Sequence, residues 1–223
     1  MKNKKTYYLM ILDRSGSMID CVNETISGFN EQIQMIKDLQ RRHSDQQFYI
    51  SLTTFNNLLD HAYQECKVEE MKELDMNSYI PNGGTALLDA IGESVMNLKA
   101  RKGDEFDRDE ATAVVVILTD GQENSSRIFK LDAIRNMIRE LEAGSNWMFS
   151  FMGATVDAIE VASSMNIRRQ NSAQFNKSDI QGSIFGLGDS FADYAKEKSE
   201  GKKPKRFLKS NVGKGNKKDP EIF

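Results

Sequence analysis

An uninterrupted apolar run, Ala113-Val114-Val115-Val116-Ile117-Leu118, does most to limit the folds open to this chain. A strand with one face in water alternates apolar and polar side chains, so this run predicts a strand buried on both faces. Such strands belong to parallel sheets, in which crossover connections place helices over both faces. The run from Tyr7 to Leu12 has the same character. We therefore expect a mostly parallel sheet at the centre of the fold.

Strand-like and helix-like segments alternate along the chain. The expected strands lie at 5–13, 48–55, 58–63, 113–118 and 147–152, with a weak edge strand at 168–173. Apolar residues at steps of three and four predict helices with stripes at 22–39, 88–98, 128–141, 158–165 and 184–194. The polar segments 69–81 and 101–110 are expected to be loops. The turn Asn56-Asn57 makes 58–63 antiparallel to the strand before it. This order predicts an α/β fold, with a doubly wound, Rossmann-like, mostly parallel sheet, one antiparallel edge strand and helices on both faces.

Length and composition indicate a soluble globular protein. At 223 residues the chain is one large domain or two small ones, and its 39% apolar and 28% charged residues are ordinary fractions. The basic start precedes a short apolar stretch that already contains Asp13, which fits neither a secretory signal nor a transmembrane helix. Cys21 and Cys66 have no metal-ligand spacing, so we expect reduced, structural thiols and a cytoplasmic location.

The formal charge of −3 is distributed unevenly. Segment 201–223 carries +6, which leaves −9 on the rest of the chain, so we expect a domain over 1–200 and a basic tail over 201–223. The charged residues of the tail are Lys202, Lys203, Lys205, Arg206, Lys209, Lys214, Lys217, Lys218, Asp219 and Glu221. Basic clusters bind nucleic acid through its phosphates. Phe207 is the one aromatic residue beside this cluster, however, and the acidic body would repel phosphate. We expect a solvated extension, with folding back onto the body or docking of an acidic partner as alternatives.

Oxygen-bearing side chains follow the two buried strands. Asp13, Ser15 and Ser17 come directly after the first strand, Asp120 follows the second, and Thr85 opens a helix. In open α/β sheets, ligands bind at the carboxyl ends of strands where the strand order reverses. Carboxylates and hydroxyls are hard oxygen ligands that suit a small divalent cation such as Mg²⁺. The sequence therefore predicts a divalent-cation site at that end of the sheet.

This set of residues resembles the metal-ion-dependent adhesion site (MIDAS) of the von Willebrand factor A (vWA) domain family. The resemblance rests on Asp-x-Ser-x-Ser at 13–17, Gly-Gly-Thr ending at Thr85 and Thr-Asp-Gly around Asp120, and it covers roughly residues 5–195. It implies Mg²⁺ or Mn²⁺ at the top of the sheet, with Ser15 and Ser17 as direct ligands. Thr85 would bind directly or through water, and Asp13 and Asp120 largely through water.

The resemblance also implies a partner and a setting. An open coordination position on the ion would take a Glu or Asp carboxylate of a partner protein. The chain is most similar to small, stand-alone members of bacterial or phage type, such as those associated with tellurite resistance and stress operons. Association with nucleic acid or a membrane is not expected.

Each of these residues also has a plain structural explanation. Carboxylates such as Asp13 and Asp120 cap helix starts, and loop hydroxyls bond their own backbone. Thr85 would serve equally well as the N-cap of the helix that it precedes. Asp20 lies near the loop but lacks a second acidic neighbour, so we expect a solvated carboxylate there.

The predicted function is a metal-dependent protein-binding module, an adaptor or regulator with no enzymatic activity and no small-molecule substrate. Two alternatives stay open: a Mg²⁺-dependent hydrolase or phosphatase using Asp13, and a structural or assembly protein with an inactive metal site. Phosphatases that use a strand-end Asp need a second Asp two residues on, where this chain has Ser15. Neither His43 nor His61 is placed as an obvious general base.

Overall fold

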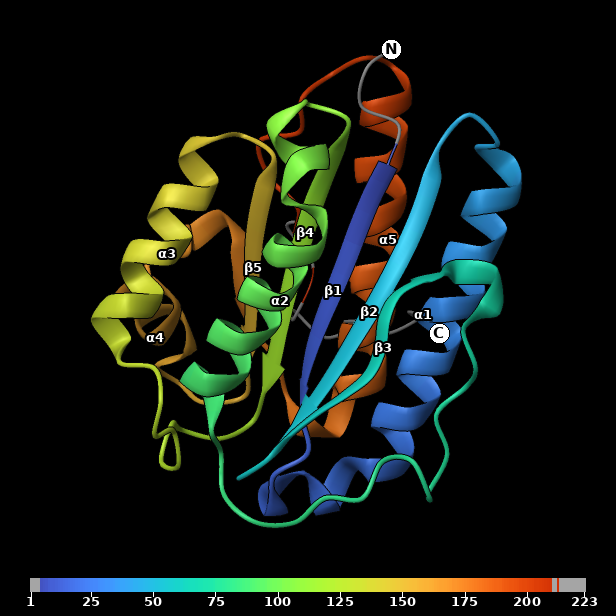
Figure 1. Cartoon of the computed structure of the whole chain (residues 1–223). Helices are drawn as coiled ribbons and strands as arrows, with labels where there is room; N and C mark the ends of the chain where they lie inside the picture. The colour runs from blue at the N-terminus through green and yellow to red at the C-terminus, as the bar shows by residue number, and fades with distance from the viewer. Residues whose placement is uncertain (1–4, 210–211, 213–223) are drawn as a thin grey trace, which may run out of the picture.

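Six strands form one sheet in the computed structural model, which describes residues 5–209 and residue 212 (Figure 1). In chain order they are β1 (Lys5–Asp13), β2 (Gln47–Phe55), β3 (Leu59–Lys67), β4 (Ala111–Thr119), β5 (Trp147–Gly153) and β6 (Ser172–Gln174). Their order across the sheet is β3-β2-β1-β4-β5-β6. β2 and β3 are antiparallel, and the other neighbouring pairs are parallel. The predicted doubly wound, mostly parallel sheet with one antiparallel edge strand is confirmed.

Helices cover both faces of this sheet, as predicted (Figure 1). α1 (Val22–Arg42) and α5 (Ile180–Ser199) pack on one face, whereas α2 (Leu87–Asp107), α3 (Leu131–Ala143) and α4 (Ala158–Ser164) pack on the other. β1 lies between β2 and β4, so the strand order reverses at the β1–β4 pair. This reversal brings the loops after β1 and β4 together at the lower end of the sheet in Figure 1.

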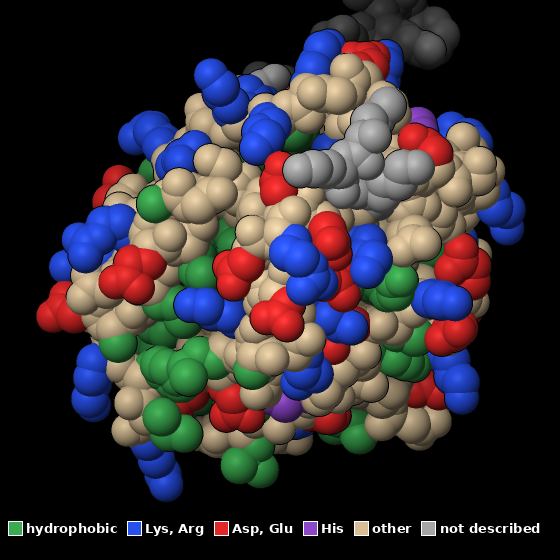
Figure 2. All heavy atoms as spheres, turned by 45° about the horizontal axis from the view of Figure 1, so that its top comes forward, with side chains coloured by type: hydrophobic (Ala, Val, Ile, Leu, Met, Phe, Trp, Pro, Cys, Tyr) green, Lys and Arg blue, Asp and Glu red, His purple; other side chains and the backbone are tan. Residues whose placement is uncertain are grey.

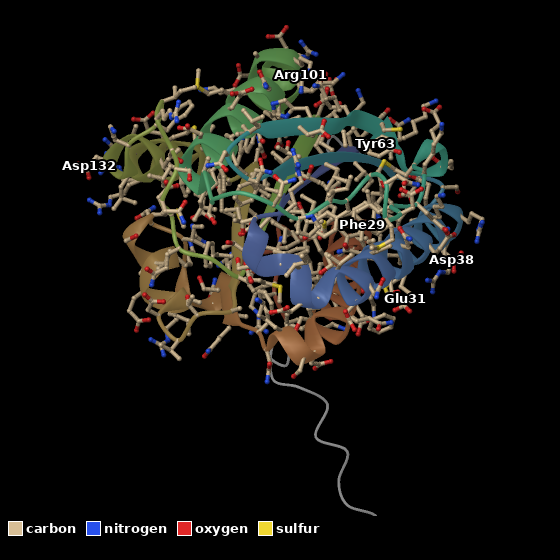
Figure 3. All side chains as sticks on the ribbon, turned by 90° about the horizontal axis from the view of Figure 1, so that it is seen from below. Phe29, Glu31, Asp38, Tyr63, Arg101 and Asp132 are labelled. Atoms are coloured by element: carbon tan, nitrogen blue, oxygen red, sulfur yellow. The ribbon has the colours of Figure 1, made fainter. Side chains whose placement is uncertain are left out.

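The central strands are apolar throughout because both of their faces are buried. Every residue of β1 after Lys5 is buried, and alternate residues enter two different hydrophobic cores. On the α1 and α5 side, Phe29 is 0% exposed and lies in the interior, whereas Glu31 and Asp38 of the same helix point outward (Figure 3). The apolar stripe of α1 therefore closes one face of the sheet.

α2 is longer than the sequence predicted, because the charged segment after residue 100 continues the helix to Asp107. The side chain of Phe106 is 5% exposed and packs against Trp147, with ring centroids 4.7 Å apart. This buried aromatic residue fixes the inner side of the last turn while its charged neighbours face water. The prediction of a loop over 101–110 is therefore wrong for 101–107.

Three other element boundaries differ from the predicted ones. β3 continues to Lys67, and α3 begins at Leu131 rather than at Ile128, whose side chain is 71% exposed. The edge strand predicted over 168–173 is mostly the 3-10 helix η3 (Arg169–Asn171), which is followed by the short β6. The first two differences lie at element ends, which a sequence pattern defines least well.

The first part of the basic tail packs onto the domain. Phe207 and Leu208 are 3% and 2% exposed and join the core that α1 and α5 form. The Phe207 backbone N–H donates to Asn171 Oδ1 at 2.9 Å. The expectation of a solvated extension is therefore wrong at these residues, which fold back onto the body. The tail residues Lys214, Lys217, Lys218, Asp219 and Glu221 lie outside the described residues. The division into 1–200 and 201–223 stays a prediction.

Acidic and basic side chains are interspersed over the surface that Figure 2 shows. Cys21 is buried and Cys66 is partly buried, and both are free thiols, as predicted. Within the described ranges, no helix is both long enough and apolar enough to cross a bilayer.

Candidate metal centre

Three loops meet at the carboxyl ends of the central strands, the end of the molecule that faces the viewer in Figure 3. The first follows β1 and leads into the 3-10 helix η1 (Gly16–Cys21), the second precedes α2, and the third follows β4. Asp13 is the last residue of β1, and the loops carry the other four residues predicted from the sequence, which are Ser15, Ser17, Thr85 and Asp120.

Oxygen atoms of the predicted residues are in contact across these loops. Ser17 Oγ donates to Asp120 Oδ1 at 2.6 Å and lies 3.1 Å from Ser15 Oγ. Thr85 faces the same group, because a Cβ placed on Gly121 would lie 2.9 Å from Thr85 Oγ1 and 3.6 Å from Ser17 Oγ. Gly121 thus leaves the space in which the three loops converge. The structure brings the predicted residues together, while their binding of a metal stays a prediction.

Asp13 is the fully buried member of the set, at 0% exposure. Its Oδ1 accepts a hydrogen bond from the Ser15 backbone N–H at 2.7 Å, and its Oδ2 accepts one from the Thr119 hydroxyl at 2.5 Å. Burial raises the pKa of Asp13 to about 6, although both hydrogen bonds oppose that rise. Asp13 therefore fixes the backbone of the Ser15 loop and adds a titratable carboxyl group to the site.

Backbone hydrogen bonds hold the first two loops against each other. Gly16 N–H donates to Gly83 O at 3.0 Å, and Asn82 N–H donates to Arg14 O at 3.0 Å. Gly83 has a φ of +71°, and a Cβ there would lie 2.2 Å from Asn57 Oδ1. Only glycine tolerates both this backbone conformation and this close approach. The glycine pair before Thr85 thus serves loop geometry, which fixes where the Thr85 side chain lies.

Thr85 is held by the third loop through its backbone. Its N–H donates to Asn124 Oδ1 at 2.9 Å, and its carbonyl accepts from the N–H groups of Asn124 and Ser125 at 3.1 and 3.2 Å. The N-cap position of α2 belongs to Ala86. The alternative that Thr85 is the helix N-cap is therefore wrong, and its side chain is turned toward Gly121.

Lys177 is a site residue that the sequence did not single out. It begins the 3-10 helix η4 (Lys177–Asp179), directly before α5, and its ammonium group lies 2.5 Å from Asp120 Oδ2 and 2.5 Å from Ser17 O. The Asp120 side chain is 1% exposed, and the Lys177 ammonium group is the charged partner of its Oδ2. Burial lowers the pKa of Lys177, but the hydrogen bond and charge of Asp120 outweigh it, so the net shift is upward. The contact joins segments far apart in the chain, so no local pattern marks Lys177.

The residues at this site suit a hard divalent cation. Six oxygen ligands at 2.0–2.1 Å from Mg²⁺ place adjacent ligands roughly 3 Å apart, and the 3.1 Å between Ser15 Oγ and Ser17 Oγ matches that spacing. Asp120 Oδ2 supplies a buried carboxylate oxygen, which the Lys177 ammonium group contacts in this structure. Groups of three or more His, Cys, Asp or Glu that would hold a metal are absent from the described residues. The available donor set is therefore one of hydroxyls with two carboxylates. Asp20 is exposed beside it.

Residues 9–186 match the family model of the von Willebrand factor type A domain. The match covers most of the 223 residues, so the chain belongs to this family, as the sequence resemblance predicted. No curated protein sequence matches the chain.

Solved structures share this fold at low sequence identity. Proximal thread matrix protein 1 of the mussel byssus, solved with a zinc-occupied MIDAS motif, has a TM-score of 0.56 at 13% identity, over 85% of this chain and 46% of that one. The ArnB paralog VWA2 from Sulfolobus acidocaldarius has a TM-score of 0.53 at 18% identity, over 83% and 45%. The manganese-loaded TRAP protein of Plasmodium vivax has a TM-score of 0.53 at 15% identity, over 82% and 72%. The chain spans less than half the length of the first two proteins, and identities this low show the fold alone.

Proposed function

We propose that this protein is a binding module that captures an acidic group of a partner protein through Mg²⁺ or Mn²⁺. Ser15 and Ser17 would hold the ion directly, Thr85 directly or through water, and Asp13 and Asp120 largely through water. The ion would supply an electrophilic position that accepts a Glu or Asp oxygen, since Mg²⁺ takes six oxygens and protein sites seldom fill all of them.

The observation that carries this proposal is the convergence of oxygen atoms from three loops. Ser15 Oγ, Ser17 Oγ and Asp120 Oδ1 form a continuous chain of contacts at 3.1 and 2.6 Å. Two carboxylates balance the charge of a divalent ion, whereas neutral hydroxyls leave it able to attract a further anion. The ammonium group of Lys177 beside Asp120 is consistent with a position that favours a cation.

A protein partner fits the surroundings better than a small molecule. Five large apolar side chains, between 53% and 91% exposed, lie in the loops at the carboxyl ends of the strands. This apolar rim consists of Ile19, Leu58, Ile80, Ile128 and Val156. Exposed apolar groups gathered at one end of a domain are typical of protein interaction surfaces.

A catalytic role finds little support among the side chains near the cluster. His61 is held between Thr53, at 2.9 Å, and Glu93, at 3.0 Å, on the β2, β3 and α2 side of the fold. His43 is the C-cap of α1. Neither histidine contacts the oxygen cluster, so neither is placed to act there as a general base for hydrolysis.

Affinity capture tests the proposal. Wild-type protein and the Ser15→Ala/Ser17→Ala double variant are used as bait in lysate, either with about 1 mM Mn²⁺ or with chelator. Weak cation sites fill in this concentration range. Ser27→Ala, at an exposed position of α1, is the matched control. A partner retained by wild type and Ser27→Ala, but lost in the double variant and with chelator, supports the proposal. Mg²⁺-dependent phosphatase activity that Asp13→Ala abolishes would instead support the hydrolase.

A further inference from the structure

A large groove extends from the candidate metal centre along the free edge of the sheet. Its volume is about 1380 Å³, and it runs from Asp120 past β6 to the folded-back tail at Val212. Its lining comes from η3, β6 and the residues that follow β6, and from the tail segment 206–209. We call it the β6 groove.

The β6 groove is strongly basic although the body of the protein is acidic. Its charged lining consists of one acidic residue, Asp120, and five basic residues, Arg168, Arg169, Lys177, Arg206 and Lys209. Arg168 forms an ion pair with Glu142 at 3.2 Å, and Lys209 forms one with Asp193 at 3.1 Å. Arg169 forms no ion pair with any described residue. The groove therefore retains positive charge after its internal pairs are counted, and it attracts anions.

The floor and edge of the groove suit an extended chain. Phe175, Leu208 and Val212 are among the lining residues, and because they are 2%, 2% and 7% exposed they add small apolar patches to the lining. β6 pairs with β5 on one side, and no described strand pairs with its other edge. An unpaired strand edge offers backbone N–H and C=O groups to an extended peptide, while pockets beside it hold alternate side chains.

From this charge and shape we infer that the β6 groove binds an extended acidic peptide segment of the partner protein. One acidic side chain of that segment would reach the Asp120 end of the groove, where the proposed metal lies, and further acidic side chains would meet Arg169 and Arg206. The inference rests on the proposed function only for the metal contact, because the arginine contacts are independent of any ion.

Other occupants fit the groove less well. A nucleic-acid backbone would bring its phosphates close to the Asp120 carboxylate, which repels them. The apolar residues of the lining cannot form hydrogen bonds or ion pairs with phosphate. The chain's own last residues, 213–223, contain Lys214, Lys217 and Lys218 against Asp219 and Glu221, so their charge does not complement the groove. A second copy of the chain would present a body with a charge of −9, but its other edge strand, β3, carries Asp60 and Glu65 against Lys67, and Glu65 is already paired with Arg101 at 2.8 Å.

The test uses the full chain and a fluorescein-labelled peptide of about twelve residues with alternating Glu and Val, a length that spans roughly 40 Å when extended. Fluorescence anisotropy measures its Kd with Mn²⁺ and with chelator, against a matched Lys/Val peptide and a single-stranded oligonucleotide of the same length. The Arg169→Glu/Arg206→Glu variant reverses the groove charge. Arg42→Glu/Arg139→Glu reverses two exposed charges on α1 and α3 that do not line the groove.

We expect the groove variant to weaken binding of the Glu/Val peptide by about tenfold or more, and the control variant to change the Kd less than about twofold. Calorimetric Mn²⁺ affinity should be the same in both variants. Equal peptide affinity in wild type and the groove variant would overturn the inference that the groove binds the peptide, even if Mn²⁺ still binds. Loss of peptide binding in the groove variant with no effect of chelator would retain the groove and reject the metal contact. Tighter binding of the oligonucleotide, or self-association seen by light scattering and lost in the groove variant, would also overturn the inference.

Discussion

Replacing Lys177 by Met should tighten the binding of a divalent cation. The Lys177 ammonium group lies 2.5 Å from Asp120 Oδ2 and 2.5 Å from Ser17 O, so it shares two ligand residues with the proposed ion. An arriving cation must displace this ammonium group or be repelled by it. Methionine keeps an apolar stem of similar length and removes the charge.

The size of the effect follows from the contacts that Lys177 gives up. A hydrogen bond to a charged group contributes about 1.5–3 kcal/mol. The Lys177 side chain is 34% exposed, and water screens part of that energy, so we take the lower end. Since about 1.4 kcal/mol corresponds to a tenfold change in an equilibrium constant, the Kd for Mn²⁺ should fall about tenfold. The metal-free variant should unfold about 2–6 °C lower, because the buried Asp120 carboxylate loses its partner.

Isothermal titration calorimetry with Mn²⁺ and thermal unfolding in chelator measure these two effects. Lys72→Met, at an exposed position between η2 (Val68–Glu70) and α2, is the matched control and should leave both values unchanged. Equal or weaker Mn²⁺ affinity in Lys177→Met would refute the argument that the ammonium group competes with the ion.

Three further results are expected. Burial raises the pKa of Asp13 from 3.8 to about 6. The stability that this group gives the metal-free protein is therefore fully present below about pH 4, and about 3 kcal/mol of it is lost as the pH rises through about 6. Urea unfolding in chelator should show this pH dependence in wild type, and Asp13→Asn should lack it. Gly121→Ala places a Cβ 2.9 Å from Thr85 Oγ1, so calorimetry should show weaker Mn²⁺ binding, while Gly103→Ala, where nothing lies within 4 Å, should not change it. Phe207→Ala should lower the free energy of unfolding by about 3–5 kcal/mol, because Phe207 is 3% exposed in the core; a change below about 0.5 kcal/mol, as at surface sites, would mean that the tail does not contribute to the fold.

Much of the fold was predictable because its buried strands carry a strong local signal. The runs that became β1 and β4 are apolar without alternation, and their burial on both faces requires helices above and below. The end of α2 was not predictable in this way. Its last turn is mostly charged, and Phe106 anchors it through contacts with Trp147 and Tyr7, which lie far from it in the chain.

Some residues of the candidate site were likewise predictable from local sequence, and others were not. Asp13, Ser15 and Ser17 follow a buried strand in a short motif, and Asp120 follows its neighbour in the sheet, so local sequence and sheet topology together place them at one end. Lys177 reaches the site through a contact between distant segments, and a lysine in a loop carries no signal of its own. Gly121 was visible only as part of the Thr-Asp-Gly motif, and the space that it leaves for Thr85 is a tertiary feature. The packing of Phe207 is likewise set by tertiary contacts, against a local composition that is charged and typical of a solvated segment.

The binding of one divalent ion by the loop cluster is the claim on which the functional account depends. Calorimetric titration of the chelator-treated protein with Mn²⁺, repeated on Ser15→Ala/Ser17→Ala and on the control Ser27→Ala, tests it most directly. The account predicts one ion for each chain in wild type and in Ser27→Ala, and no measurable binding in the double variant. Absence of binding heat in wild type, together with a melting temperature that Mn²⁺ leaves unchanged, would contradict it, because an ion held only by the folded state must raise stability.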